Sequence, residues 1–328
     1  MRVLSCLAGL LLSSSAFAGV TSVDLSNYQL TATHSLPPVS AAEASSITYN
    51  WDTHTLFVLG DEGDALAEVS TTGQLISEMT LIGFDDTEGL TYIGNGQFVL
   101  VEERLQDAFL FTYAAGGSIS RSSLPFVSLG PTVSNIGLEG ICFDPLSGKY
   151  VTVKEKTPQA VTEATINWGG PSATVIDLFT PNLGVLDLSD VQVLTTVPSL
   201  IGTADQDNLI IYSQESQRLM EVSRTGQVLS TFSFIGIATD AEGVTIGPDG
   251  VIYVVGETPA LYVLTPIATP CPSDVTGDLQ VNVNDLLAVI NAWGPCGGCP
   301  ADIAPARPDG QVNVNDLLAV INGWGACP

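Results

Sequence analysis

The sequence has little positive charge and almost no histidine. Its 328 residues include 9 Lys and Arg against 35 Asp and Glu, with a formal net charge of −26 and two histidines. So few cations cannot neutralise a run of phosphates, which excludes a nucleic-acid-binding protein. His34 and His54 stand in no metal-ligand or catalytic-triad pattern, so zinc hydrolysis and histidine-based acyl transfer lack their parts. The sequence also has no Gly-x-Ser-x-Gly elbow, phosphate-binding loop or dinucleotide fingerprint.

Charged residues of both signs are scarce, at 13% of the chain, while 45% of the residues are hydrophobic. This balance excludes a disordered acidic segment and predicts a folded chain with a large core. Carboxylates with few cations among them suit divalent metal ions or cationic partners better than anionic membranes. Calcium is therefore the first ligand that the composition suggests.

Long apolar runs are missing after the first 18 residues, so we expect no membrane-spanning helix in the mature chain. Residues 1–18 have the pattern of a secretory signal peptide, with Arg2, an apolar run over residues 3–12, and Ala16-Phe17-Ala18 before the cut. The alternative is an uncleaved anchor, but the run is well short of the roughly 20 apolar residues that a span needs. We therefore expect a secreted or cell-envelope protein in an oxidising compartment.

Cysteine is also scarce before the tail. Cys6 belongs to the expected signal peptide, and Cys142 lies alone in an apolar strand pattern of the middle section, where it is expected to be a buried free thiol. Four more cysteines fall in the last 58 residues, and four cysteines allow three pairings. The tail is an internal duplication, and one pair of cysteines brackets each copy. We therefore predict the disulfides Cys271–Cys296 and Cys299–Cys327.

Each copy in the tail places a loop rich in oxygen-bearing side chains directly before a helix. The helix is predicted because Leu286, Val289, Ile290 and Trp293 recur at helical spacing. In the first loop, oxygens fall at positions 1, 3, 5, 7, 9 and 12, which suits a calcium ion because it takes six to eight oxygen ligands. These residues are Asp274, Thr276, Asp278, Gln280 through its carbonyl group, Asn282 and Asp285.

The second loop departs from this spacing. Three extra residues lie between Asp302 and Asp309, so position 3 does not align, while the first loop has Leu279 where an EF-hand has glycine. The residues that do align are Asp302, Asp309, Gln311, Asn313 and Asp316. The alternative interpretation of both loops is a solvated acidic turn without metal.

With this duplication, residues 271–328 resemble the type I dockerin module, which binds calcium in two loop-helix halves. The resemblance implies docking to a cohesin-like module of another protein or to a cell surface. It places the residues that select the partner at Val283, Asn284, Val314 and Asn315. Dockerins often accompany polysaccharide-degrading enzymes, but the rest of the chain shows no paired-carboxylate pattern of a glycosidase.

Residues 19–268 contain short alternating apolar runs that end at Gly, Asp or Asn turns, which predicts an all-β domain. The strand-turn-strand pattern of residues 66–75 recurs at residues 219–228. Five units of about 40–60 residues have the period of four-stranded propeller blades. We predict that the run over residues 28–34 completes the last blade. Six blades are the alternative, if residues 157–198 hold an extra sheet.

This section, over residues 25–266, resembles the SdiA-regulated propeller family. The segments that carry the resemblance are Asp86–Leu90, residues 94–104, Leu138–Ile141, Val153–Lys156 and Asp240–Val244. The resemblance implies a secreted or envelope-associated propeller, with members linked to calcium and no established reaction. The expected organisation is a signal peptide at 1–18, the propeller at 19–268, a linker at 269–270 and the dockerin-like module at 271–328.

The propeller repeats carry acids at both ends of a strand pair. An acid before the first strand and an acid after the second lie at the same end of an antiparallel pair, so we expect one acidic rim around the channel mouth. Carboxylates so close together repel one another unless a cation bridges them. Calcium suits this role because it prefers carboxylate oxygens as ligands. The alternative is a structural ring that accepts backbone N–H groups or pairs with Arg104, Lys154 and Lys156. The predicted ring is Glu43, Glu88, Glu139 and Glu242.

Taken together, the sequence favours an exported calcium-binding propeller with a docking module and no catalytic activity. The alternative is a calcium-dependent hydrolase of phosphoesters or lactones, with its site at the acidic mouth.

Overall fold

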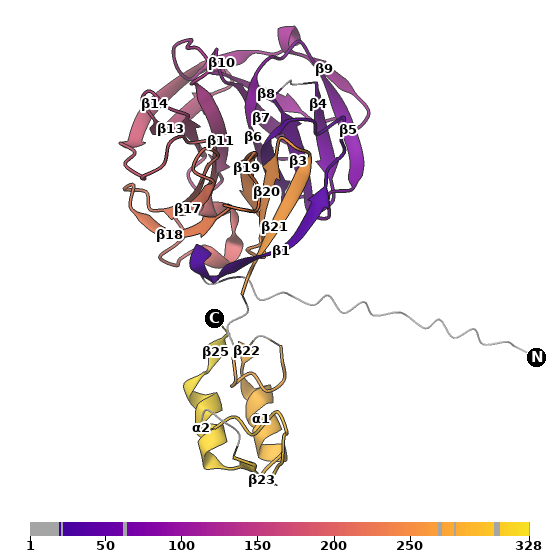
Figure 1. Ribbon diagram of the computed structural model, residues 1–328, viewed down its shortest axis with the longest axis vertical. Helices are drawn as coiled ribbons and strands as arrows, with labels where there is room; N and C mark the ends of the chain where they lie inside the picture. The colour runs from indigo at the N-terminus through magenta and orange to yellow at the C-terminus, as the bar shows by residue number, and fades with distance from the viewer. Residues whose placement is uncertain are drawn as a thin grey trace, which may run out of the picture. The chain divides into compact units, whose positions relative to one another are not determined.

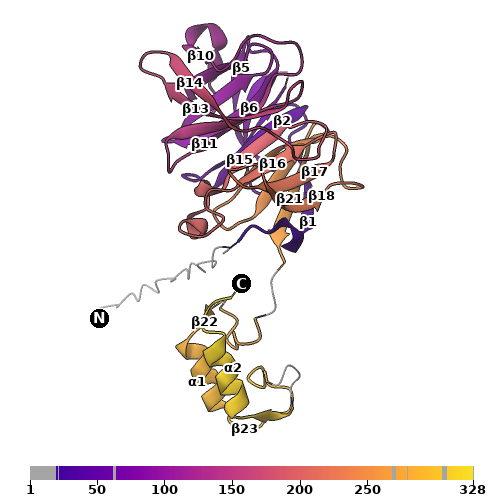
Figure 2. The ribbon, with the colours of Figure 1, turned by 90° about the vertical axis from the view of Figure 1, so that its left-hand side faces the viewer.

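The computed structural model describes residue 20 and residues 22–61, 64–267, 271–278, 280–304 and 309–327 (Figures 1 and 2). These residues fall into two compact units, one within Gly19–Ile267 and one within Ala268–Pro328. The predicted signal peptide and linker, and Leu279, lie outside the described residues. In the described part of the chain, no helix has the length and hydropathy to cross a membrane.

The first unit is a propeller of five antiparallel blades, as Figure 1 shows, and this confirms the predicted fold. Blade one contains β2 (Ala44–Asn50), β3 (Thr55–Gly60), β4 (Ala65–Val69) and β5 (Leu75–Ile82), with β9 (Ser118–Ser120) parallel to β5. Blade two contains β6 (Thr87–Gly94), β7 (Gln97–Glu102), β8 (Asp107–Thr112) and β10 (Phe126–Ser128). Blade three contains β11 (Leu138–Asp144), β12 (Lys149–Lys154), β13 (Ala160–Asn167) and β14 (Ser172–Phe179).

Blade four contains β15 (Asp190–Val193), β16 (Leu209–Ser213), β17 (Arg218–Val222) and β18 (Val228–Ser233). Blade five contains β19 (Ala241–Ile246), β20 (Ile252–Gly256) and β21 (Ala260–Pro266), and the N-terminal strand β1 (Tyr28–Ser35) completes it. The indigo β1 runs antiparallel beside the orange β21 in Figure 1, so the predicted closure is confirmed. Six blades are excluded because residues 157–198 supply β13 and β14 to blade three and β15 to blade four.

The innermost strands are tied to one another by a ring of side-chain acceptors, one from each blade. Each acceptor takes a hydrogen bond from the neighbouring blade, at 2.9–3.4 Å. Cys142 is the member from blade three, and its Sγ accepts the N–H of Val193 at 3.4 Å. This explains the buried free thiol, as predicted, and burial raises its pKa to about 12. The ring residues are Thr48, Thr91, Cys142, Gln192 and Thr245.

The second unit is built on two helices of nine residues, α1 (Val283–Asn291) and α2 (Val314–Asn322), which lie side by side in Figures 1 and 2. Asn282 and Asn313 cap them through capping boxes with Asp285 and Asp316. Two short antiparallel pairs join the copies: β22 (Gln280–Val281) with β25 (Gly325–Ala326), and β23 (Gly294–Pro295) with β24 (Gln311–Val312). The buried residues between them are Val281, Val289, Ala301, Val312 and Val320.

The predicted disulfide pairing is wrong. The structure joins Cys271 to Cys327 and Cys296 to Cys299, with Cα atoms 5.7 Å apart in each pair. The reason is that β22 of the first copy pairs with β25 of the second, which brings the start and the end of the unit together. Each copy therefore pairs with the other copy instead of closing on itself.

Candidate metal centres

The acidic repeats of the propeller meet in one cavity of about 210 Å³. In each strand pair that carries them, the start of the inner strand lies opposite the end of the second strand, as in the pairs Thr87–Glu102, Leu138–Lys154 and Ala241–Gly256. The acids at both positions therefore lie at one end of the propeller. The cavity is lined by Asp61, Glu88, Asn135, Glu139, Glu155, Asp187, Ser189, Gln214, Glu242 and Glu257.

Close packing between neighbouring blades explains why each Glu-Gly repeat has a glycine. A Cβ atom on Gly140 would lie 2.8 Å from the Cα atom of Asp190 in the next blade. A Cβ on Gly243 would lie 2.8 Å from the Cα of Ser46, and one on Gly89 would lie 3.2 Å from the carbonyl oxygen of Glu139. Glycine thus lets neighbouring inner strands approach closely, while the preceding glutamate lines the cavity.

The structure brings Glu88, Glu139 and Glu242 together but does not place Glu43 with them. Glu43 is exposed and has a φ of 49° in the turn before β2, and Ser45 takes the corresponding register position. Ser45 donates a hydrogen bond to the carbonyl of Thr87 at 2.9 Å. The side chain at this position therefore links blade one to blade two. Sequence reasoning placed the acid two residues early because Glu43-Ala imitates the Glu-Gly pattern.

Sequence reasoning also missed three residues that line the cavity. Ser189 takes the register position in blade four and precedes β15. Asn135 and Asp187 come from the loops before β11 and β15. The run Asp187-Leu-Ser-Asp190 before an apolar strand was the available signal.

Burial and mutual repulsion raise the pKa values of the cavity glutamates. Burial is the largest cause, and it raises the pKa of Glu242 to about 10, with further repulsion from Glu88 and Glu257. Burial followed by repulsion from neighbouring carboxylates raises the pKa values of Glu88 and Glu139 well above their usual range. A cation, or protons held by these groups, would relieve the repulsion.

Glu139 and Glu155, which line the cavity, form a cluster with Glu103, which lies outside the cavity lining. Oxygen atoms of Glu103, Glu139 and Glu155 lie within 4.8 Å of one another. Glu103 is 1% exposed, and its Oε1 accepts the N–H of Gly137 at 2.7 Å. Its Oε2 is buried and accepts no N–H or hydroxyl group of the described residues, and the Glu103 carboxyl adjoins those of Asp86 and Glu139, which can share a proton with it. Two oxygens bound to one Ca²⁺ at 2.3–2.6 Å can be at most about 5 Å apart, so the cluster fits a shared calcium ion.

The three nearby cations are engaged outside this cluster or at its edge. Arg104 pairs with Asp86 at 3.0 Å and donates to Asn135 at 2.7 Å. Lys156 bridges Glu155 at 2.5 Å and Glu215 at 2.8 Å. Lys154 donates to the carbonyl of Lys156 at 2.5 Å. The predicted alternative of a structural ring therefore describes Glu155 in part, but leaves Glu103 Oε2 unsatisfied.

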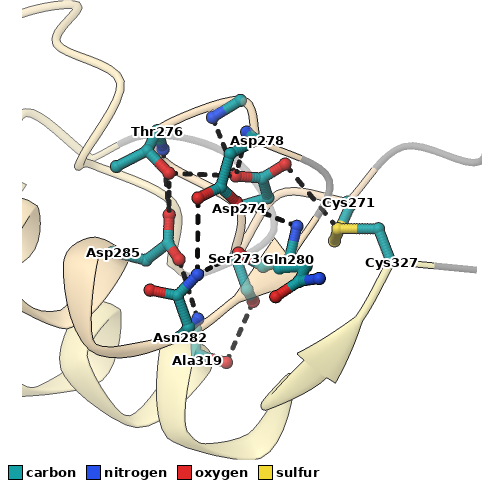
Figure 3. Close-up of a disulfide and its surroundings, with 11 residues drawn as sticks. Cys271, Ser273, Asp274, Thr276, Asp278, Gln280, Asn282, Asp285, Ala319 and Cys327 are labelled. Atoms are coloured by element: carbon teal, nitrogen blue, oxygen red, sulfur yellow. Dashed lines mark hydrogen bonds between the residues drawn. A yellow bond between two sulfur atoms is a disulfide. The ribbon is translucent and has the colours of Figure 1, made fainter. Parts of the chain in front are cut away.

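The first tail loop groups Asp274, Asp278 and Asp285, whose oxygens also lie within 4.8 Å of one another (Figure 3). Asp285 accepts the N–H groups of Thr276 at 2.9 Å and Asn282 at 2.8 Å. Burial alone would raise the pKa of Asp285, but these hydrogen bonds lower it below the ordinary value. The structure thus brings together the carboxylates at three of the six predicted positions, Asp274, Asp278 and Asp285.

The other predicted oxygens of this loop are held by hydrogen bonds. Asn282 Oδ1 accepts the N–H of Asn284 as the helix cap, and its Nδ2 donates to the carbonyl of Gln280 at 3.3 Å. The hydroxyl of Thr276 donates to Asp285 at 2.8 Å (Figure 3). Asp274 Oδ1 accepts the N–H of Gly277 at 2.7 Å, which curls the loop around its first carboxylate.

The second tail loop is arranged differently. Asp302 accepts the N–H groups of Asp309 and Gly310, at 3.1 and 2.7 Å, and Asp316 accepts those of Ile303 and Ala304, at 2.7 and 2.8 Å. Gln311 donates its N–H to Asp309, and Asn313 donates its N–H to Asp316. No group of three carboxylates forms here within the part of the loop that the structure describes, which excludes residues 305–308.

The predicted partner-selecting residues lie at the first turns of the two helices. Val283 and Asn284 begin α1, and Val314 and Asn315 begin α2, and all four are exposed. They are therefore accessible to a partner on both copies.

Comparisons with known proteins concern the propeller. A family model described as SdiA-regulated matches residues 20–265. The glutaminyl cyclase of Myxococcus xanthus is similar over 73% of this chain and 95% of its own, with 13% identity and a TM-score of 0.51. A luciferin-regenerating enzyme is similar over 71% of this chain and 94% of its own, with 14% identity and a TM-score of 0.44. Virginiamycin B lyase of Staphylococcus aureus covers 71% of this chain and 69% of its own, with 12% identity and a TM-score of 0.39. At 13% identity the likeness to the glutaminyl cyclase concerns the fold alone.

Proposed function

The chain belongs to the SdiA-regulated family, and on that premise we propose that it is an exported calcium-binding propeller whose tail docks it to a partner. In this proposal, the propeller binds calcium in its acidic cavity, and the dockerin-like tail binds calcium in its first loop. The role of the protein is binding rather than catalysis.

The observation that carries the propeller site is the unsatisfied Glu103 inside a carboxylate cluster. A buried carboxylate oxygen without a donor is costly, and its neighbours Glu139 and Glu155 add repulsion. A calcium ion bound by these three residues would supply the missing positive charge and relieve both costs. The ligands are hard oxygen donors, which calcium prefers.

The tail is the second part of the proposal. Its first loop offers Asp274, Asp278 and Asp285, and a unit of this size has too small a core to be stable without disulfides or metal. Calcium would fix the loop at the start of α1, and with it the exposed residues Val283 and Asn284. We propose that these residues, with Val314 and Asn315, contact a cohesin-like protein or a cell-surface partner.

Calorimetric titration of the full chain with calcium tests the two sites separately. Replacing Glu139→Gln together with Glu155→Gln should remove the propeller site and leave the tail binding unchanged. Replacing Asp274→Asn together with Asp285→Asn should have the opposite effect. Glu78→Gln, on the exposed face of β5, is the matched control and should change neither. If the Glu139→Gln and Glu155→Gln protein binds calcium as the wild type does, the propeller site is refuted.

Calcium-dependent hydrolysis of phosphoesters or lactones is the second candidate, and the size of the cavity favours it. A volume of about 210 Å³ exceeds what one ion occupies, so a substrate oxygen could reach a bound calcium. Glu88, which lines the same cavity, would then hold or accept the proton. Glu88→Gln should abolish turnover without lowering the melting temperature. A wild-type protein that is inactive on a panel of both substrate types removes this candidate.

A further inference from the structure

The most exposed aliphatic side chains of the described chain all lie at the acidic end of the propeller. Val39 is 85% exposed, Ile235 is 73% exposed and Leu186 is 65% exposed, the three largest values among the large hydrophobic residues described. They occupy the loops that connect the outer strand of one blade to the inner strand of the next, after β1, β18 and β14. Single exposed aliphatics are ordinary, but three on equivalent loops form a pattern.

These loops lead directly to the cavity. They end at β2, β19 and β15, the inner strands whose starting ends surround the cavity, and Leu186 immediately precedes Asp187, which lines it. The mouth therefore has an acidic centre and apolar side chains on its surrounding loops. We refer to the cavity and these three loops as the acidic mouth.

The acidic mouth holds more carboxyl groups than one calcium ion and its neighbouring lysine can pair with. Seven carboxyl groups line the cavity, namely Asp61, Glu88, Glu139, Glu155, Asp187, Glu242 and Glu257. A divalent ion and the ammonium group of Lys156, which pairs with Glu155, bring three positive charges to them. The volume of about 210 Å³ also far exceeds the roughly 10–15 Å³ that one water molecule requires. There is room and charge for a further cationic group.

One buried oxygen atom in the acidic mouth and one beside it make no hydrogen bond with an N–H, hydroxyl or carbonyl group of the described residues. Ser189, which is 5% exposed and lines the cavity, leaves its Oγ unpartnered. Glu103, in the cluster with Glu139 and Glu155, leaves its Oε2 unpartnered. Buried polar atoms in native proteins are normally satisfied, so each of these atoms indicates a missing ligand group. The calcium proposal accounts for Glu103 and leaves Ser189.

We propose that the acidic mouth is a docking surface for a protein segment that inserts a lysine or arginine side chain into the cavity. The charged end would bind Ser189 and the carboxylates of Glu242 and Glu257. Apolar residues flanking the inserted side chain would rest on Val39, Leu186 and Ile235, which would exclude water from the ionic contact. This inference goes beyond the calcium site, because it requires no metal at Glu103, Glu139 and Glu155.

Binding of short capped peptides to the full chain, measured by calorimetry, tests the proposal. The probe is acetyl-Leu-Lys-Leu-amide, and its analogue with norleucine in place of lysine keeps the four side-chain carbons and lacks the ammonium group. The lysine peptide should bind at least about tenfold more tightly than the analogue, because the analogue cannot form the buried ion pair. Binding should persist in chelator, which separates this proposal from the calcium site.

Two pairs of variants distinguish the acidic mouth from general attraction to an acidic protein. Glu242→Gln with Glu257→Gln should weaken the lysine peptide about tenfold, a change of about 1.4 kcal/mol. Glu78→Gln with Asp177→Asn removes the same charge from exposed outer strands and should change binding less than about twofold. Leu186→Ser should weaken binding, whereas Leu146→Ser, at the opposite end of its blade and 58% exposed, should not.

Three results would overturn the proposal. The first is absence of binding of the lysine peptide at millimolar concentration. The second is equal binding of the norleucine analogue. The third is equal weakening by the two double variants, which would mean that net charge alone attracts the peptide.

Discussion

Replacing Gly140 by alanine should destabilise the propeller, because the glycine of the Glu-Gly repeat is where two blades touch. The new Cβ atom would lie 2.6 Å from Oδ1 and 2.8 Å from Cα of Asp190, and 2.9 Å from a methyl group of Val153. Such distances are below van der Waals contact, and the Cα atom belongs to the inner strand of the next blade. The strands must therefore separate by several tenths of an ångström or distort.

Overpacking of a well-packed core lowers the free energy of unfolding by about 1–3 kcal/mol. The unfolded chain is less flexible with alanine than with glycine, which offsets about 0.4–1 kcal/mol of this loss. The net cost of about 0.6–2 kcal/mol should lower the melting temperature of a unit of this size by roughly 1–8 °C. Thermal unfolding followed by circular dichroism measures the change. Gly170→Ala is the control, because the nearest atom to its new Cβ is 3.6 Å away, and it should melt within about 1 °C of the wild type. An unchanged melting temperature for Gly140→Ala would refute this explanation of the repeat.

Three further predictions address the site, the ring and the tail. The pKa values of Glu88, Glu139 and Glu242 are raised in the folded state, to about 10 for Glu242, so folding favours the protonated form of each carboxyl group. The resulting contribution to the free energy of unfolding is complete below about pH 4.5 and is lost as the pH rises towards 10. Melting temperatures in chelator should therefore fall over this range, calcium should reduce the fall, and a flat profile in chelator would contradict the pKa shifts. Cys142→Thr should keep an acceptor for the N–H of Val193 and leave the stability nearly unchanged. Cys142→Val should lower the free energy of unfolding, measured in denaturant, by about 1–3 kcal/mol because that N–H loses its acceptor. Equal stability of the two variants would contradict the role of the ring of side-chain acceptors. A chelator should lower the protection of the α1 amides from hydrogen exchange, and Asp285→Asn should lower it in the presence of calcium. Equal protection with and without calcium would contradict a loop that is held by a metal ion.

The sequence was sufficient for the blade architecture because both relevant patterns are local and periodic. Short alternating strands indicated five units, with six as the alternative that the structure excludes, and the Glu-Gly repeats placed Glu88, Glu139 and Glu242 at one end. Closure by β1 could be predicted since the last unit lacked an outer strand and the N-terminal run has the alternating pattern to supply it.

The errors arose where the answer depends on contacts between distant segments. Glu43 has the right residue type, but the turn before β2 gives it a positive φ and places Ser45 in the register position. Asn135 and Asp187 reach the cavity from long loops that have no periodic pattern. The disulfide between Cys271 and Cys327 depends on how the two tail copies pair, which the symmetry of their sequences does not reveal.

We propose that calcium occupies the acidic cavity of the propeller. Anomalous diffraction from crystals of the full chain grown with calcium tests this proposal. We expect a peak bonded to carboxylate oxygens of Glu103, Glu139 and Glu155 at about 2.3–2.6 Å, with a second peak in the loop of Asp274, Asp278 and Asp285. A map with peaks in the tail alone, at a calcium concentration that saturates the protein in solution, would contradict it.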